Sequence, residues 1–354
     1  MTELAEGVQA AGSARYRALV RRRILLLGAL ALALCLSLLV DVSTGPASYP
    51  LPDVLRAILS PSQASAQLGA IVWAIRMPSA LMAAVVGLAL SVAGGQMQTI
   101  LNNPLASPFT LGISAAASFG AALTIAFGIT LVPVAADYAV PANAFAVAML
   151  TALAIHALSL RRDATVHSVV LLGIALVFTF NALLAMVQFV ASDQAVAAVV
   201  FWTMGSLTKA TWPKLAVTVA AICVAVPVFV LRRWSLTALR MGEARAASFG
   251  IRVRRLRLET LMLVALLAAV PVSFVGTIGF IGLVGPHIAR MLIGEDQRFF
   301  LPATALCGAL IMSLSSIVAK TLIPGAIIPI GIVTSLVGIP LFFFLILRNG
   351  RPSW

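Results

Sequence analysis

The residues able to do chemistry in this chain lie far apart in the sequence. Its three cysteines show no CxxC spacing, so neither a disulfide framework nor a cysteine metal site is expected. Triad catalysis needs a nucleophile, a base and an orienting acid at one site, and no such set is present. The eleven carboxylates, all in expected tails, loops or helix ends, are Glu3, Glu6, Asp41, Asp53, Asp137, Asp163, Asp193, Glu243, Glu259, Glu295 and Asp296. We therefore predict no catalytic residue, no metal site and no enzyme activity.

The lysines exclude a nucleotide site of the P-loop kind. That motif places a lysine directly after a glycine, whereas Thr208, Pro213 and Ala319 precede the three lysines here. If ATP drives this protein, a partner subunit must bind ATP and Mg²⁺, and this chain needs no cofactor of its own. This points to a permease subunit.

Two segments combine glycine, proline and polar residues after long apolar runs. The first, residues 102–112, follows the apolar residues 79–98, and the second, residues 279–290, follows the apolar residues 259–279. Paired interruptions in antiparallel halves are typical of transporters with an inverted internal repeat, where they line the pathway. The alternative is that the prolines only end helices. The candidate pathway residues are Asn102, Asn103, Pro104, Pro286 and His287.

A basic loop at residues 232–258 contains eight arginines. Its centre predicts a short helix from Glu243 to Phe249, because this stretch is rich in alanine and lacks proline and glycine. Gly242 and Gly250 bracket it. We interpret it as a docking element for the ATPase; a solvated basic loop is the alternative. The candidate coupling residues are Met241, Gly242, Glu243, Arg245, Ala246, Phe249 and Gly250.

Composition indicates the elements that position these residues. The chain has 354 residues, of which 61% are hydrophobic and 10% charged, and its mean hydropathy is +1.08. A soluble domain is about half apolar and about a quarter charged, and disorder requires low hydrophobicity. Both classes are excluded, and we predict an all-α polytopic membrane protein.

Ten hydrophobic segments are expected to cross the membrane. They form a single permease domain over residues 22–348, between cytoplasmic tails at 1–21 and 349–354. Residues 280–294 are too few for a straight span, so a short or broken helix is predicted there. The segments are 22–40, 69–98, 109–131, 139–160, 166–190, 213–231, 259–279, 280–294, 299–320 and 327–347.

The basic residues predict the orientation. With the N-terminus inside, most of the 24 lysines and arginines lie on the inner side, which the positive-inside rule favours. Both termini are then cytoplasmic. The net charge of +13 follows from this topology and from contact with anionic membrane lipid. Binding of nucleic acid is not expected.

At this point several motifs resemble those of the FecCD-type ABC permeases. They are Arg76 to Pro78, Asn103 to Gly112, Gly279 to Arg290 and Pro329 to Thr334, together with the stretch from Gly242 to Gly250, which resembles the coupling loop. The similarity extends over about residues 20–348. It implies the type II ABC importer permease fold, with about ten transmembrane helices in the bacterial inner membrane.

The resemblance also implies partners. A second copy of the permease or a close paralogue, two P-loop ATPase subunits and a periplasmic substrate-binding protein are expected. Closure of the ATPases on ATP would move the coupling loops and switch the channel between outward and inward access. Members of the family import iron–siderophore chelates, haem or vitamin B12.

Further site residues follow from the resemblance alone. Arg76 and Lys320 match basic positions that meet acids of the binding protein. At the position of Lys320, arginine is usual in the family. Three positions depart from the family pattern: Ser79 replaces an arginine, Ser316 an aspartate and Ile328 an acid.

The resemblance places the cytoplasmic gate at Val166 and His167, between the fourth and fifth spans. The leading hypothesis is the permease of a binding-protein-dependent importer of an iron(III)–siderophore chelate. A haem or vitamin B12 importer of the same family is the alternative. A stand-alone secondary transporter is a second class of hypothesis, which the missing intramembrane carboxylates disfavour.

Overall fold

A computed structural model describes residues 2–47, 49–61, 65–159 and 166–348, and within these ranges every regular element is helical. Seven helices are long and apolar enough to cross a membrane, and three apolar helices are shorter. Each of the ten predicted segments overlaps one of these helices, seven of them of span length. The ten are α1 Thr2–Ser43, α4 Met77–Ile100, α5 Ile113–Phe127, α6 Ala136–Ser159, α7 Val166–Val190, α9 Trp212–Leu231, α12 Val253–Val275, α13 Ile281–Ile293, α14 Gln297–Thr321 and α15 Ile330–Arg348.

Several short elements connect these helices. A five-residue helix and a six-residue π-helix lead directly into α4 and make one continuous rod. The sequence predicted α11, but α2, α8 and α10 fall in segments expected to be loops. The six short elements are α2 Leu51–Leu59, α3 Ala66–Ala70, η2 Ile71–Arg76, α8 Asp193–Thr203, α10 Arg233–Leu239 and α11 Glu243–Ser248.

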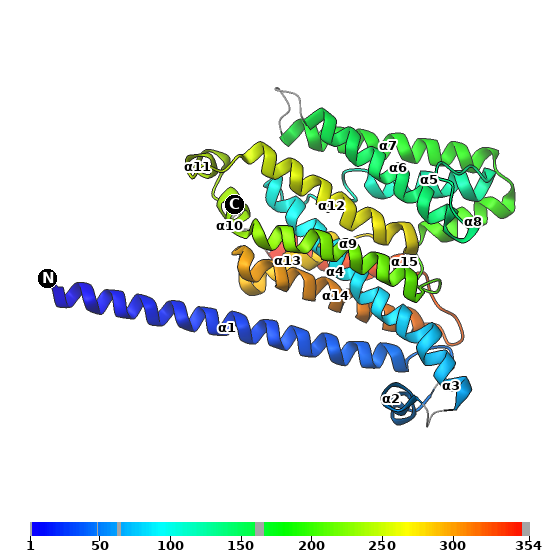
Figure 1. Ribbon diagram of the computed structural model, residues 1–354, viewed down its shortest axis with the longest axis horizontal. Coiled ribbons are helices and arrows are strands. Elements are labelled where there is room, and N and C mark those ends of the chain that lie inside the picture. Colours follow the sequence, from blue (N-terminus) through cyan, green and yellow to red (C-terminus); the bar gives the residue numbers. More distant parts are fainter. Residues whose placement is uncertain (1, 48, 62–64, 160–165, 349–354) are drawn as a thin grey trace.

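The helix α1 differs from the prediction at its start. It runs without interruption from Thr2 to Ser43, so the described part of the expected tail belongs to the same helix as the first span. Its apolar stretch, Tyr16–Ser43, is little buried by the rest of the chain and lies along one edge of the bundle (Figure 1). The boundary predicted at residue 21 therefore marks a change of polarity, not the end of an element.

The helix α4 forms the centre of the bundle and packs against α12, α13 and α14. Glycines allow its backbone to approach two of these neighbours closely. A Cβ atom on Gly94 would lie 1.8 Å from the carbonyl oxygen of Gly282 in α13, and one on Gly87 would lie 2.3 Å from that of Gly308 in α14. Small residues at such crossings drive helix association in membranes by close packing.

The two interrupted segments share a backbone design. Helix α4 ends before Asn102, which has a φ of +43°, and a turn leads to Gly112 at +80° and the short α5. Helix α12 ends at Gly276, with a φ of +78°, and Phe280 at +66° precedes the short α13. Helix α4 starts near α2 and α3, whereas α12 starts at the opposite end beside α11 (Figure 1). The two interrupted segments thus follow helices that run in opposite directions, as the predicted inverted repeat requires.

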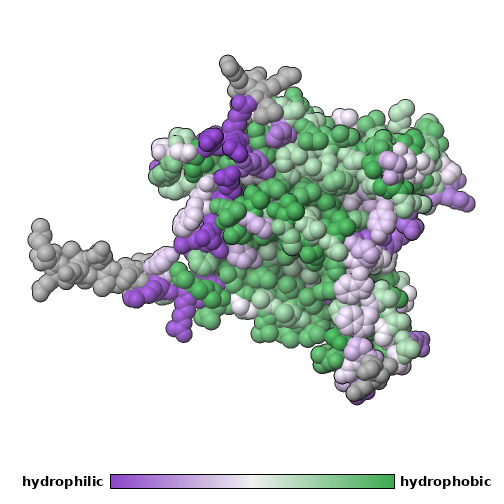
Figure 2. Space-filling view, in the orientation of Figure 1, coloured by the Kyte–Doolittle hydropathy of each residue, from purple (hydrophilic) through white to green (hydrophobic). Residues whose placement is uncertain are grey.

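Polarity divides the molecule into flanks and ends. Hydrophobic side chains cover the helical flanks, and hydrophilic ones gather where α10, α11 and the start of α12 lie (Figure 2). We call this the α11 end, and the opposite end, with α2 and α3, the α2 end. The apolar flanks suit a hydrocarbon environment.

Candidate functional site

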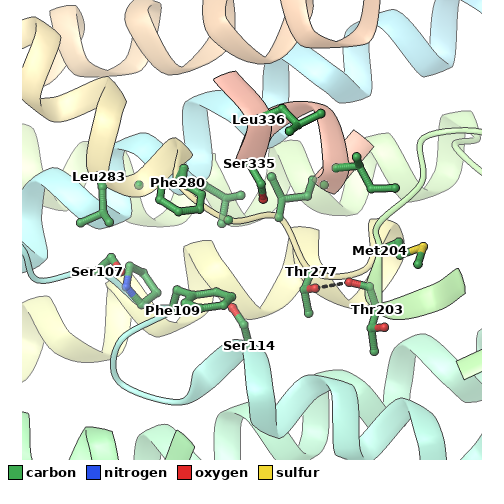
Figure 3. Close-up of a pocket in the computed structure, with 17 residues that line it drawn as sticks. Ser107, Phe109, Ser114, Thr203, Met204, Thr277, Phe280, Leu283, Ser335 and Leu336 are labelled. Carbon is green, nitrogen blue, oxygen red and sulfur yellow. Dashed lines mark hydrogen bonds between the residues drawn. The ribbon is translucent and has the colours of Figure 1, made fainter. Parts of the chain in front are cut away.

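The two breaks meet at one cavity of about 480 Å³. Leu90 of α4, helix α15 and the end of α8 complete its wall, so five separate parts of the chain form it. In Figure 3 the first break lies across the cavity from Phe280 and α15. Lining residues from these parts include Ser107, Phe109, Ser114, Thr277, Phe280 and Ser335.

The lining is electrically neutral. Its side chains are aliphatic, aromatic, hydroxyl or thioether groups, and several positions are glycine. None of the residues that line this cavity is ionisable. A neutral wall of small and apolar groups offers weak, spread contact to a solute instead of a tight charged site. This matches a corridor more closely than a catalytic centre.

Local hydrogen bonds hold the first break open. Ser107 and Thr110 bond reciprocally: the backbone N–H of Ser107 donates to Thr110 Oγ1 at 3.0 Å, and Thr110 Oγ1 donates to the Ser107 carbonyl at 2.8 Å. Gly112 then takes a left-handed conformation against Leu176 of α7. Unwound backbone at membrane depth is tolerated only where such partners or a cavity satisfy it.

The second break is anchored to the segment after α8. The hydroxyl of Thr277 donates to the carbonyl of Thr203, the bond drawn in Figure 3, and the N–H of Ser206 donates to the Val275 carbonyl at 2.7 Å. Gly276 lies so close to this segment that a Cβ would be 2.2 Å from the Trp202 carbonyl oxygen. The unpredicted helix α8 therefore positions one wall of the cavity.

The predicted pathway residues lie beside the cavity and do not line it. Asn102 accepts a hydrogen bond from Arg240 at 3.0 Å, and Asn103 accepts one from the backbone of Leu105 at 2.9 Å. Pro104 follows in the same turn, Pro286 is buried within α13, and His287 is half-buried there. The two interrupted segments contain only some of the lining residues, among them Ser107, Phe109 and Phe280, and only the fold shows which side chains face inward.

The predicted gate residues lie at the start of α7. Val166 is its first residue, and the side chain of Val166 lies outside the described residues. His167 is exposed. His167 is not among the described residues that line the cavity.

The predicted coupling helix is present as α11, bracketed by Gly242 and Gly250 with φ of +107° and +77°. Ala246 is fully buried and anchors the helix to the bundle, whereas the side chain of Phe249 is 65% exposed. Glu243 forms an ion pair with Arg257 of α12. Of the remaining candidates, Met241 and Arg245 are exposed. One face of α11 is thus attached to the protein and the other is open to a partner.

The two predicted docking cations have partners within the chain. Arg76 is buried and donates to the carbonyls of Val42 and Ser43 at the end of α1 and of Ala47 in the segment that follows. The guanidinium also lies 5.2 Å from the centre of the Tyr49 ring. Arg76 therefore fastens this segment to the start of α4 and does not project from the surface.

Lys320 contributes to a buried ion pair that the sequence did not reveal. Its ammonium lies 2.6 Å from Asp41 Oδ1, and the hydroxyl of Ser316 donates to the same oxygen at 3.0 Å. The Asp41 side chain is fully buried. Asp41 on α1 thus supplies an acid beside Ser316, the position at which the family pattern has an aspartate. No local spacing pairs Asp41 with a lysine 279 residues away.

Asp296 connects α1 and α14 at the α11 end. It caps α14 by accepting from the Arg298 backbone at 3.1 Å, binds the Arg298 guanidinium at 2.6 Å, and lies 3.6 Å from Arg23 of α1. The hydrogen bond from the Arg298 side chain holds the pKa of this carboxyl below its usual value.

Comparison with known proteins gives concordant findings. A sequence model of the FecCD transport family matches residues 30–348. The hemin transport system permease protein of Yersinia pestis is 38% identical, over 78% of this chain and 82% of its own length. An iron chelatin transport system permease protein of Helicobacter pylori is 37% identical, over 80% of this chain and 84% of its own.

A solved structure agrees in its fold. It is described as an inward-facing conformation of a metal-chelate type ABC transporter, and it superposes with a TM-score of 0.80 at 30% identity. The match covers 91% of this chain and 99% of the other.

Proposed function

The chain belongs to the FecCD transport family and is the permease of an ABC importer, and on this premise we propose that its cargo is an iron(III)–siderophore chelate. It acts as a transport subunit, while a partner subunit binds ATP and Mg²⁺ and hydrolyses the nucleotide. The cargo passes between the two breaks, in the cavity that Figure 3 shows.

The neutral lining of the cavity carries this proposal. A bare metal cation or an oxyanion would lose its hydration there without gaining a charged partner, because no ionisable side chain lines the wall. A chelate presents the organic surface of its ligand and keeps the metal satisfied inside. The weak contacts available from Phe109, Phe280 and the hydroxyls of Ser107 and Ser335 suit such a surface.

Relatives support a chelate and leave haem as the second candidate. The Helicobacter pylori relative is named for iron chelatin and the Yersinia pestis relative for hemin. Both cargoes enclose iron in an organic ligand. The alternative function is therefore import of haem, or of vitamin B12, through the same cavity.

The assembly follows the ABC importer plan. The α11 end faces the cytoplasm of a bacterium, with both termini on that side of the inner membrane, since most of the arginines gather there. Two ATPase subunits bind α11 of two permeases, which are two copies of this chain or this chain with a paralogue. A periplasmic binding protein delivers the cargo at the α2 end.

The remaining predicted site residues take specific places in this scheme. Val166 and His167 lie toward the inner gate, at the start of α7. Arg76 and Lys320 shape the surface on which the binding protein docks, through the contacts that they make inside the chain. Asn102, Asn103, Pro104, Pro286 and His287 support the cavity from behind its wall.

Uptake by the reconstituted importer tests the cargo. Vesicles that contain the permease, its ATPase and its binding protein are expected to accumulate ⁵⁵Fe supplied as a ferric siderophore, and to do so only with ATP. Excess gallium siderophore should compete, whereas hemin and cyanocobalamin should not. Accumulation of hemin with no ferric siderophore uptake would replace the proposed cargo by the alternative one.

Complex formation tests the docking surface. The double variant Glu243→Arg/Phe249→Asp puts a charged group in place of the exposed Phe249 and reverses the charge of Glu243, which also removes its ion pair with Arg257, and we expect at least a tenfold loss of ATPase recovered with the permease. Arg232→Ala is the matched control, because Arg232 belongs to the same basic loop but pairs with Glu259 of α12 at 3.0 Å. Undiminished recovery with the double variant would contradict docking on α11.

A further inference from the structure

The segment between α10 and α11 carries an arginine that reaches both breaks. We propose that Arg240 is the positioning residue that transmits movement of α11 to the walls of the cavity. This inference rests on the proposed docking of the ATPase on α11. It goes further by assigning the connection between that docking site and the pathway to one side chain.

Arg240 contacts the first break directly. It ends α10 and lies three residues before α11, and its Nη1 donates to Asn102 Oδ1 at 3.0 Å. Asn102 begins the turn that leads to Ser107 and Phe109, and its left-handed backbone fixes the direction of that turn. A displacement of Arg240 therefore pulls on the segment that forms one wall.

The same arginine reaches the second break through Glu295. Its guanidinium binds both carboxylate oxygens of Glu295, with Nε 3.1 Å from Oε2. Arg290 of α13 pairs with the same carboxylate at 3.1 Å. Helix α13 begins next to Phe280 and contains Leu283, and both residues line the cavity. Glu295 is thus shared between the coupling segment and the helix of the second wall.

A cross-link completes this arrangement. Arg290 Nη2 donates to Gln98 Oε1 at 3.0 Å, and Gln98 Nε2 donates to the Gly282 carbonyl at 3.4 Å, so α13 is also tied to the end of α4. We call Arg240, Asn102, Glu295 and Arg290 the inner relay. A planar guanidinium that binds a carboxylate and an amide together holds both partners in a fixed orientation. A lysine ammonium lacks this planar arrangement of donors.

The geometry favours a relay over a simple anchor. The side chains of Arg240 and Arg290 are only 15% exposed, so solvent screens their bonds weakly. Glu295 is 42% exposed and serves two cations at once, which leaves an excess of positive charge at the cluster. When α11 moves, a shared, half-exposed carboxylate is able to bind one of the two arginines more closely and the other less closely.

Cysteine accessibility separates this role from docking. In nanodiscs with its ATPase, and with Cys35, Cys223 and Cys307 replaced by alanine, the permease carrying Ser335→Cys is labelled with a maleimide reagent. The labelling rate is compared between the nucleotide-free and the vanadate-trapped complex. We expect at least a fivefold change in the parent and less than a twofold change with Arg240→Ala, at an ATP hydrolysis rate within twofold of the parent.

Two further variants make the result decisive. Glu295→Gln keeps the shape of the side chain and removes its charge, so it should reduce the labelling response even if Arg240→Ala does not fold. Arg232→Ala, whose partner Glu259 contacts neither break, should leave the response intact. A full labelling response in Glu295→Gln and in any folded Arg240→Ala would overturn the relay. So would a parallel loss of ATPase binding, because Arg240 would then belong to the docking site.

The same measurements distinguish this inference from the proposed function. If the parent itself shows no nucleotide-dependent labelling, or if the α11 double variant still recovers ATPase, then the docking scheme fails. If docking holds and only the Arg240 and Glu295 variants respond normally, then the relay alone is wrong.

Discussion

At the α2 end, the two cations Arg76 and Lys320 are enclosed with partners of their own, whereas at the α11 end two arginines share one half-exposed carboxylate. Lys320 pairs with a fully buried Asp41, and Arg76 donates to three backbone carbonyls. Glu295, in contrast, serves both Arg240 and Arg290. Enclosed one-to-one pairs fix a geometry, because either partner alone is costly to bury. Shared pairs in contact with water permit rearrangement.

The difference indicates which end of the protein is held by enclosed contacts. The α2 end ties α1, the start of α4 and α14 together through Arg76, Asp41 and Lys320. The α11 end joins its elements by bonds that have alternatives. The proposed docking of the ATPase on α11 predicts this difference between the ends.

The largest effect is expected from Lys320→Ala, which tests whether the ion pair at the α2 end is enclosed. It leaves the Asp41 carboxylate buried without its cation, and we expect the free energy of unfolding in detergent to fall by about 3 kcal/mol. Thermal denaturation of the purified permease measures this. The double variant Asp41→Leu/Lys320→Met should recover most of the loss, because an apolar pair of similar size replaces the ions. A loss below about 1 kcal/mol for the single variant would show that the pair is not enclosed.

A smaller effect is expected at the α11 end. Arg232→Ala removes an ion pair with Glu259 in which the arginine side chain is 47% exposed. Water and salt screen such a pair, so the free energy of unfolding should fall by less than about 1 kcal/mol. The same denaturation assay, run beside Lys320→Ala, gives the ratio of the two effects. Equal losses would remove the distinction between the ends.

The smallest effect concerns acid. Arg298 lowers the pKa of Asp296, so the stabilisation from this carboxylate is present above its usual pKa and is lost as the pH falls through the lowered value, below about 4. The variant Asp296→Asn should therefore lose less free energy of unfolding than the parent as the pH falls from 5 to 3. At pH 3 the two proteins should differ little in stability. An unchanged slope of stability between pH 5 and pH 3 in the variant would contradict the assignment.

The sequence predicts the helices well, because a bilayer requires about 20 apolar residues per span and such runs are visible directly. It also identifies both interrupted segments and α11. It misses α2 and α8, which are shorter than a span and lie in mixed composition. The cavity itself is beyond reach, since Ser335 meets Phe280 only after α15 and α13 have packed.

Long-range polar pairs are unpredictable for the same physical reason. In the sequence, Asp41 is an acid at the end of a predicted span, and no neighbouring residue indicates its partner in α14. Arg76 matches a docking position in the family pattern, yet its guanidinium donates to carbonyls at and just after the end of α1. Composition records how many charges a chain has, while packing decides which of them reach the surface.

The contact between Gly94 and Gly282 has a mechanical consequence. With a virtual Cβ only 1.8 Å from the opposing carbonyl oxygen, the two backbones lie in direct contact and leave no room for a side chain between them. Any larger residue at Gly94 would force α13 away from α4 and shift the two breaks that adjoin these helices. The width of the corridor therefore depends on a single hydrogen atom at this crossing.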